Sequence, residues 1–383
     1  MELKNYKLGE CLELQRGYDL TSSQMQVGEV AVVGSNGIIG YHNAERGNSP
    51  CITVGRSGSV GKVHYYEQPT WAHNTALFVK DFKGNNPKYL YYLLKNLHLD
   101  KIFERGSSVI PSLDRKLVHS LVVPFHKNIN DQRKIVAVLS ALDRKIELNK
   151  QINDNLEAMA KQLYEYWFVQ FDFPNEEGKP YKSSGGAMVW NEKLKREIPQ
   201  GWSDCKLKDF INLFDSKRVP LSSKDRGERQ GVYPYYGATG IMDYVNDYIF
   251  DGDYILLAED GSTSDAKGFP IVQYIWGKNW VNNHAHIILP KNERYTMFTY
   301  QMLRSIPAKQ IETGSIQKKI SQENLCGYKM FLPNSDLLEK YENVVFPLWE
   351  KRKRCIEEIN TLTKQRDELL PLLMNGQATV NSD

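Results

Sequence analysis

The longest amphipathic pattern in the chain runs from Asp131 to Trp167 and contains neither Gly nor Pro. Its seam positions follow one another in alternating steps of four and three residues: Ile135, Leu139, Leu142, Ile146, Asn149, Asn153, Leu156, Ala160, Leu163 and Trp167. At about 1.5 Å per residue, this a/d spacing predicts a helix of roughly 55 Å with one stripe facing a partner helix. Asn149 and Asn153 fall on that stripe. Because a buried Asn fixes register at a cost in stability, the pattern favours a paired coiled coil over an apolar core helix.

A second pattern of the same kind begins near Tyr341 and is less regular. Its four-three steps pass through Val345, Leu348, Arg352, Cys355, Ile359, Leu362, Arg366, Leu369 and Leu373. Two arginines lie on this seam, and Pro347 is expected to end or kink the helix that precedes it. The sequence therefore predicts a dependable helix from 348 to 370, which pairs antiparallel with the first helix of the same chain.

Each helical pattern follows a region of short β-rich runs broken by Gly, and the two regions repeat one another. The matched pieces are KLGECLELQRG at Lys7 with KLKDFINLFDS at Lys206, SNGIIGYHN at Ser35 with ATGIMDYVN at Ala238, Gly58-Ser59 with Gly261-Ser262, WAHNTALFV at Trp71 with WVNNHAHII at Trp280, and RGSSVIPSLDRKLVHSLVVPF at Arg105 with TGSIQKKISQENLCGYKMFLP at Thr313. Five ordered matches indicate a tandem duplication of a globule-plus-helix unit, with a period far too long for a solenoid.

The predicted fold class is α+β: two tandem mixed α/β domains, each followed by a long helix. The helices are expected to pair as an antiparallel coiled coil in a pseudo-two-fold dumbbell. The expected boundaries are 1–128 for the first domain, 129–170 for the first helix, 171–200 for a linker rich in Pro, Gly and Ser, 201–334 for the second domain, 335–376 for the second helix and 377–383 for a tail.

Composition narrows the class of protein without identifying it. A chain of 383 residues exceeds what one hydrophobic core usually organises, and its net charge of +3 is only mildly basic. The five cysteines form no C-x-x-C pair, which argues against structural zinc and against a disulfide framework. Neither an N-terminal signal region nor a long apolar run is present, so we expect a cytoplasmic protein without a membrane association.

The sequence shows no catalytic centre. GRSGSVGK at Gly55 resembles a phosphate-binding loop, but its spacing is one residue too long and Val63 replaces the Ser or Thr that would bind magnesium. A Gly-rich turn between strands explains it better. The Pro-Pro dipeptide of an adenine methyltransferase site is absent. The His pair in HAH at 284–286 has no evident third ligand, so we expect a surface or groove-facing pair and no metal site.

Binding to DNA fits the loops better than catalysis does. Loops rich in Gly, Ser, Arg and Lys let the backbone approach phosphates and offer donors to base edges. The candidates in the first domain are Arg56, Ser57, Ser59, Lys62, Arg105, Ser107, Ser108, Ser112, Arg115 and Lys116. Those in the second domain are Lys217, Arg218, Lys224, Arg226, Arg229, Ser262, Ser264, Lys267, Gln317, Lys318 and Lys319. A single charge of this kind is more often a solvated surface residue, but these sets fall in corresponding loops of both halves.

With these features in place, the chain resembles a known family over essentially its whole length: the specificity (S) subunits of type I restriction–modification enzymes. The resemblance rests on the duplication, on DQRKIVAVLSALDRKIELNKQINDNLEAMAKQLYEYWFVQF at Asp131, on REIPQGW at Arg196 and on TLTKQRDELLPLLMNGQ at Thr361. It also rests on GSSVIPSL at 106–113, whose counterpart GSIQKKIS at 314–321 is more divergent.

The resemblance implies a non-catalytic subunit. Each globular domain would be a target recognition domain for one half of a bipartite sequence in double-stranded DNA, and the helices would set the gap between the halves. The helices would also dock two methyltransferase subunits, and two restriction subunits would complete the complex. S-adenosylmethionine, ATP and Mg would then belong to the partner subunits, with no cofactor in this chain.

Three other interpretations stay open at this stage. The chain could serve a related enzyme that cuts beside its recognition site, which only the partner would distinguish. It could be a coiled-coil scaffold whose domains bind protein, which predicts no salt-dependent binding to duplex DNA. An enzyme on a β-rich fold would need a convergent set of catalytic groups, and the sequence shows none.

Overall fold

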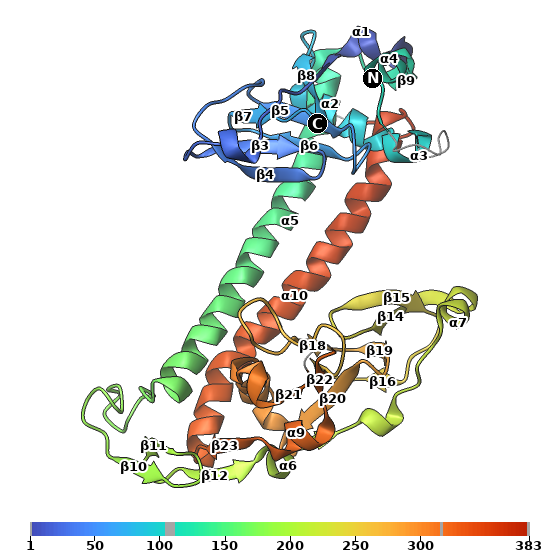
Figure 1. The fold of residues 1–383 in the computed structure, drawn as a ribbon. Coiled ribbons are helices and arrows are strands. Elements are labelled where there is room, and N and C mark those ends of the chain that lie inside the picture. The colour runs from blue at the N-terminus through green and yellow to red at the C-terminus, as the bar shows by residue number, and fades with distance from the viewer. Residues whose placement is uncertain (1, 104–111, 315–316, 381–383) are drawn as a thin grey trace. The chain divides into compact units, whose positions relative to one another are not determined.

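A computed structural model describes residues 2–103, 112–314 and 317–380, and the chain divides into two compact units (Figure 1). Unit 1 comprises Met1–Gln151 with Cys355–Asp383, and unit 2 comprises Ile152–Arg354. Two long helices, α5 (Ile129–Tyr164) and α10 (Ser335–Met374), contribute to both units. Across the described ranges, every helix is too short or too polar to span a bilayer.

Unit 1 contains a four-stranded sheet, a three-stranded sheet and a separate strand pair. The four-stranded antiparallel sheet has the order β2 (Glu13–Arg16), β8 (Ala76–Asp81), β5 (Cys51–Gly55) and β6 (Val63–Tyr66). The three-stranded sheet has the order β4 (Gly37–His42), β3 (Val30–Gly34) and β7 (Thr70–Ala72). Strand β1 (Lys4–Lys7) pairs with β9 (Val122–Phe125). Strand β5 is buried along its whole length, which accounts for its continuous run of mostly apolar residues without polar alternation.

Helix α2 (Pro87–Asn96) supplies much of the core of unit 1. The helix begins where the side chain of Asn86 accepts a hydrogen bond from the Tyr89 amide at 3.1 Å, with Pro87 in its first turn. Its apolar face packs into one cluster with strands β5 and β8 and with Ile135 and Leu139 of α5. The hydroxyl of Tyr92 donates to Asp143 of α5 at 2.6 Å. The shorter helices of this unit are α1 (Leu8–Cys11), α3 (Leu99–Phe103) and α4 (Arg115–Ser120).

Unit 2 repeats this architecture, as the duplicated sequence predicts. Its first four-stranded sheet has the order β13 (Ile211–Leu213), β20 (Ala285–Pro290), β17 (Tyr254–Ala258) and β18 (Val272–Ile275). Its second sheet has the order β15 (Ile241–Val245), β14 (Gln230–Tyr236), β19 (Lys278–Val281) and β16 (Phe250–Asp251). Strand β12 (Ser203–Lys206) pairs with β23 (Lys329–Leu332), and β21 (Glu312–Thr313) pairs with β22 (Lys319–Ile320). The helices are α6 (Leu207–Phe210), α7 (Ser223–Glu228), α8 (Thr296–Ser305) and α9 (Gln322–Gly327).

The segment 171–200, expected as a linker, joins the core of unit 2. It carries a hairpin of β10 (Met188–Asn191) and β11 (Arg196–Pro199). Phe173 stacks on Trp202 with ring centroids 5.5 Å apart and on Tyr181 at 4.6 Å. The guanidinium of Arg196 lies over Phe171 at 4.9 Å. Pro, Gly and Ser mark the turns of this segment, while its aromatic residues anchor it.

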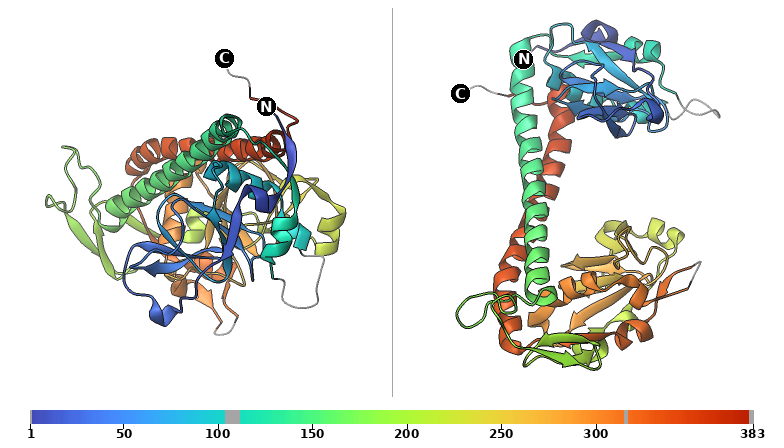
Figure 2. Two further views of the ribbon diagram at one scale, coloured as in Figure 1. Left: turned by 90° about the horizontal axis from the view of Figure 1, so that it is seen from above. Right: turned by 60° about the vertical axis from the view of Figure 1, so that its left-hand side comes forward.

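Within unit 1, the segments of α5 and α10 lie side by side and run antiparallel (Figure 2). Arg366 Nη1 donates to Asp143 Oδ1 at 3.0 Å, and Asn149 Nδ2 donates to Glu358 Oε2 at 2.9 Å. Residue numbers rise along α5 as they fall along α10, which defines the antiparallel sense. The charge that Arg366 places on the seam is therefore paired with a carboxylate of the facing helix.

Within unit 2, the remaining parts of the two helices also make contact. Tyr341 of α10 donates its hydroxyl to the Ala160 carbonyl at 3.4 Å, and Arg352 pairs with Glu157. Every seam position named from the sequence, in either helix, is buried or half-buried. The expectation that Pro347 could end the helix was wrong, because α10 continues through it from Ser335 to Met374. Val345 and Trp349 are buried on either side of the proline, and this packing offsets the roughly 3 kcal/mol that proline costs inside a helix.

Candidate nucleic-acid interface

The two loops of unit 1 that carry the DNA-binding candidates meet in the structure. One is the turn from Arg56 to Lys62 between β5 and β6, and the other is the segment just before α4. The Leu113 amide donates to the Arg56 carbonyl at 2.9 Å, and Ser57 forms an antiparallel bridge with Ser112. Backbone hydrogen bonds thus bring together Arg56, Ser57 and Ser112 and place the first turn of α4 beside them.

Other candidates in unit 1 have different surroundings. Arg115 and Lys116 open α4, directly after its N-cap Asp114. Lys62 Nζ donates to Asn36 Oδ1 at 2.7 Å, which joins the Gly-rich turn containing Ser59 to the β3–β4 turn. The Gly-rich turn lies between strands β5 and β6, as expected. The candidates Arg105, Ser107 and Ser108 lie outside the described residues.

A cavity of about 890 Å³ opens where these two loops meet the end of strand β2. Its lining includes Arg16, Arg46, Arg56 and Arg115, together with the carboxylates of Asp19 and Asp114. Sequence reasoning named Arg56 and Arg115 but missed Arg16 and Arg46. Arg16 lies within the first matched piece of the duplication and could have been found by comparing the halves, whereas nothing local marks Arg46.

In unit 2 the corresponding loops also meet. The Ile320 amide donates to the Glu259 carbonyl at 2.8 Å, and Lys319 forms an antiparallel bridge with Asp260. Lys319 Nζ lies 3.2 Å from Glu259, and Lys318 Nζ lies 3.1 Å from Glu312. The other candidates of these loops are Ser262, Ser264 and Lys267 between β17 and β18, and Gln317 before β22.

The remaining candidates of unit 2 divide by exposure. Lys217, Lys224 and Arg229 are exposed. Arg226 donates to Asp243 at 3.1 Å and to the Leu221 carbonyl at 2.9 Å, so its guanidinium is held inside the fold. Arg218 is held in the same way, because it donates to Glu259 at 2.7 Å and to the Ala285 carbonyl at 2.8 Å. These two side chains position the protein's own strands.

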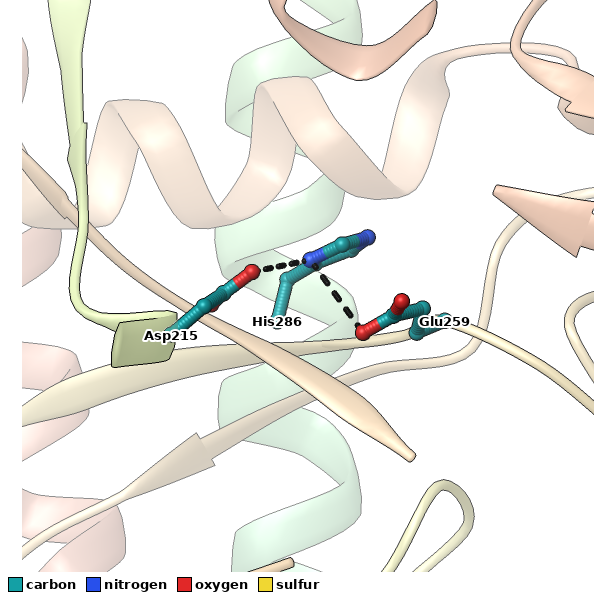
Figure 3. A group of neighbouring side chains, drawn as sticks. All are labelled: Asp215, Glu259 and His286. Carbon is teal, nitrogen blue, oxygen red and sulfur yellow. Dashed lines mark hydrogen bonds and ion pairs between the residues drawn. The ribbon is translucent and has the colours of Figure 1, made fainter. Parts of the chain in front are cut away.

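Arg218 belongs to a buried charge network around His286. Figure 3 shows three members of this network, Asp215, Glu259 and His286. His286 Nδ1 donates to Asp215 Oδ2 at 2.6 Å, and Glu259 Oε2 lies 3.8 Å from the same nitrogen. His286 Nε2 lies 2.7 Å from the Ile320 carbonyl, so both ring nitrogens face acceptors. Asp215 also accepts from the Ile287 amide at 2.9 Å and from Gln322 at 2.6 Å.

The expectation of a surface pair of histidines at 284–286 was wrong for one member. His286 is fully buried, while His284 is exposed and pairs with Asp260 at 2.6 Å. His284 lies just before β20, which begins at Ala285, whereas His286 lies within that strand, so the two rings meet different surroundings. The groups near His286 come from Asp215 and Glu259, 71 and 27 positions away in the chain, where sequence spacing cannot reveal them.

Hydrogen bonding decides the charge of the two carboxylates in this network. Burial raises the pKa of Asp215, but the His286 side chain and the Ile287 amide outweigh it and hold that pKa below its ordinary value. Burial likewise raises the pKa of Glu259, and hydrogen bonding and charge from Arg218 and His286 bring it below its ordinary value. Both groups are therefore anions balanced by neighbouring cations.

The donor atoms of Asp215, Glu259 and His286 all lie within 4.8 Å of one another, close enough to hold a metal ion. The position is nevertheless already compensated, because Arg218 and Lys319 neutralise the carboxylates. A metal would also require the proton that His286 Nδ1 donates to Asp215 to be removed. We therefore assign the network a structural role.

Comparison with known proteins shows what class of protein this architecture defines. The model of the type I restriction modification DNA specificity domain matches residues 1–158 and 199–340, once for each half of the duplication. The chain therefore belongs to this family. Like the relatives named below, it is a specificity subunit and not a catalytic one.

Particular relatives support this assignment. The type I restriction enzyme MjaIX specificity subunit of Methanocaldococcus jannaschii is 26% identical over 316 residues, covering 76% of this chain and 69% of its own. The HindI specificity subunit of Haemophilus influenzae is 22% identical over 369 residues, covering 76% of this chain and 77% of its own. The crystal structure of a type I restriction-modification S subunit from M. genitalium shares the fold, with a TM-score of 0.63 at 18% identity over 100% of this chain and 97% of that one.

Proposed function

We propose that each unit of this chain recognises one half of a bipartite, asymmetric sequence in double-stranded DNA. The observation that carries the proposal is the duplication of one β-rich unit with different side chains at matched positions. A duplicated unit can engage two sites on one duplex, and different side chains give the two sites different sequences. Phosphate contacts by exposed Lys and Arg would supply salt-dependent affinity, and a few base contacts in each unit would supply specificity.

The long helices would set the number of unspecified base pairs between the half-sites. Their antiparallel contacts within each unit support this role, because paired helices are stiffer than a single chain segment. The helices would also dock two methyltransferase subunits, and two restriction subunits would complete a cytoplasmic complex. S-adenosylmethionine, ATP and Mg would bind to those partners.

The test is to sequence the methylated bases of a host that expresses this chain with its methyltransferase partner. We expect adenine methylation confined to one bipartite motif with a fixed gap. Exchanging residues 1–128 for those of another specificity subunit should change one half of the motif and leave the other half and the gap unchanged. An exchange of 201–334 is the matched control and should change the opposite half. An active methyltransferase that leaves no bipartite motif would contradict the proposal and favour a protein scaffold.

A further inference from the structure

The Arg-lined cavity of unit 1 and the charge network of unit 2 occupy the same place in the duplicated fold. In unit 1 the Leu113 amide donates to the Arg56 carbonyl at 2.9 Å, and in unit 2 the Ile320 amide donates to the Glu259 carbonyl at 2.8 Å. These equivalent hydrogen bonds place Arg56 of one unit at the position of Glu259 in the other.

Strand register gives a second equivalence. In unit 1, Arg16 of β2 is opposite Leu77 of β8. In unit 2, Leu213 is opposite Ile288 and the Phe214 amide donates to the Ile287 carbonyl at 2.8 Å, so the next residue, Asp215, falls beside His286. Arg16 thus corresponds to Asp215, and the apolar Leu77 corresponds to His286.

The start of a short helix, α4 in unit 1 and α9 in unit 2, gives a third equivalence. Asp114 caps α4 in unit 1, and Ser321 caps α9 in unit 2. The residue after each cap faces the same region: Arg115 lines the cavity of unit 1, and Gln322 donates to Asp215 in unit 2. At this place in the fold, two arginines of the first unit, Arg16 and Arg56, correspond to carboxylates in the second, Asp215 and Glu259. Arg115 corresponds to the neutral Gln322.

The two positions also differ in how their charges are balanced. In unit 2, the carboxylates form ion pairs with Arg218 and Lys319, and Asp215 also lies 2.6 Å from His286 Nδ1. In unit 1, no carboxylate of the described chain lies within ion-pair distance of Arg46, Arg56 or Arg115, whereas Arg16 pairs with Asp19 at 3.3 Å. Asp114 uses its carboxylate to cap α4. Among the residues that the structure describes, the cavity of unit 1 therefore has three guanidinium groups without a carboxylate partner.

One of these guanidiniums is held in a fixed position. The Arg46 guanidinium carbon lies 4.0 Å from the centroid of Tyr18 and 5.6 Å from that of Trp71. Cation–π contacts of this kind orient a planar guanidinium and lower the entropy that it loses on binding. A fork of N–H groups in a fixed orientation suits a partner with two adjacent acceptor atoms.

We propose that this cavity, lined by Arg16, Arg46, Arg56 and Arg115, binds acceptor atoms of the target DNA and makes unit 1 chemically different from unit 2. The proposal rests on the proposed function, because it assigns residues to one half of the bipartite target. Two adjacent acceptors on DNA come from the O6 and N7 atoms of guanine or from the oxygens of a backbone phosphate. Both sources accept bidentate hydrogen bonds from arginine. The equivalent position in unit 2 has its donors occupied and does not bind this chemistry.

The experiment uses the full chain in complex with its methyltransferase and compares wild type, the double variant Arg56→Gln with Arg115→Gln, and the control Lys4→Gln. Lys4 is an exposed cation of β1 outside the cavity lining. The measurements are the methylated motif in cells and the affinity for a target duplex at several salt concentrations. We expect the double variant to lose roughly 10- to 100-fold in affinity, and the control to match wild type.

The pattern of loss distinguishes the two sources of the acceptor. If the double variant accepts other bases at one base pair of one half-site and leaves the other half unchanged, the cavity binds a guanine edge. An unchanged motif with uniformly weaker binding, and a salt slope reduced by about one per arginine lost, assigns it to phosphate. Arg56→Lys tests the same point in a variant that keeps the charge. It should relax specificity at a guanine but largely preserve a phosphate contact.

Two outcomes would overturn the proposal in distinguishable ways. In the first, the wild type methylates a bipartite motif, and the double variant matches Lys4→Gln in motif, affinity and salt slope. The cavity then has no part in DNA recognition. Absence of a bipartite motif in the wild type refutes the proposed function and this assignment with it. Thermal unfolding of the purified complexes confirms that the variants compared are folded.

Discussion

Glu342 is a buried carboxyl group within unit 2, on the part of α10 that follows Leu337 and Leu338 in the core. Its Oε1 accepts a hydrogen bond from the Phe298 amide at 2.7 Å. No cation in the described part of the chain forms an ion pair with it. Burial raises its pKa to about 8, although the amides of Phe298 and Met297 act in the opposite direction. The group is therefore largely protonated in the folded protein at neutral pH.

This shift makes unit 2 less stable as pH rises. The folded state keeps a proton that the unfolded chain releases near the ordinary value of 4.5, so stability is full below that pH and is lost as pH rises toward 8. The slope is about 1.4 kcal/mol per pH unit, which gives a loss of about 3 kcal/mol at pH 7. Glu342→Gln removes the titrating proton and keeps an oxygen that can accept from Phe298. We expect it to raise the free energy of unfolding by about 3 kcal/mol at pH 7 and by less than about 1 kcal/mol at pH 5.

Urea unfolding of the full chain at pH 5, 7 and 8.5, followed by tryptophan fluorescence, measures these differences. Glu339→Gln is the matched control, because Glu339 lies on the same helix and is exposed. The control should change stability by less than about 0.5 kcal/mol at each pH. A gain from Glu342→Gln that is equal at pH 5 and pH 8.5 would show that Glu342 does not titrate in this range. A loss of stability at pH 8.5 would refute the reasoning outright.

Three further predictions concern the helix pair and the charge network. Leu139→Ala empties a fully buried position of α5 and should lower the free energy of unfolding by about 2–5 kcal/mol, measured by urea titration. Arg366→Ala leaves Asp143 without its partner on the facing helix and should cost about 1–3 kcal/mol; a double-mutant cycle with Asp143→Ala that shows no coupling would contradict this. Asp215→Asn removes the anion beside His286. Folding lowers the pKa of Asp215, so its contribution to stability is full above about pH 4 and is lost as pH falls through the lowered pKa. The variant should therefore be less stable than wild type at pH 7 in thermal unfolding, and the difference should shrink as pH falls below about 4.

The sequence alone determined the two long helices and the repeated unit, because both can be recognised from the order of residues along the chain. The four-three spacing predicted helices at α5 and α10, because residues three and four apart share one helix face whatever the rest of the chain does. The ordered matches between the halves predicted a repeated unit, and the two sheets with equivalent strand order confirm it. The expectation that Pro347 could end the helix was wrong because a local rule took no account of burial on both sides of the proline.

Only the tertiary structure decided which side chains meet. Arg16, Arg46, Arg56 and Arg115 come from four separate segments, and backbone hydrogen bonds between distant loops bring them to one cavity. The partners of His286 likewise come from distant segments, just beyond the ends of strands β13 and β17. Sequence reasoning named candidates loop by loop but could not separate an occupied cation such as Arg218 from an available one such as Arg56. That difference depends on the distance to a carboxylate far along the chain, and such distances are set by strand pairing and packing.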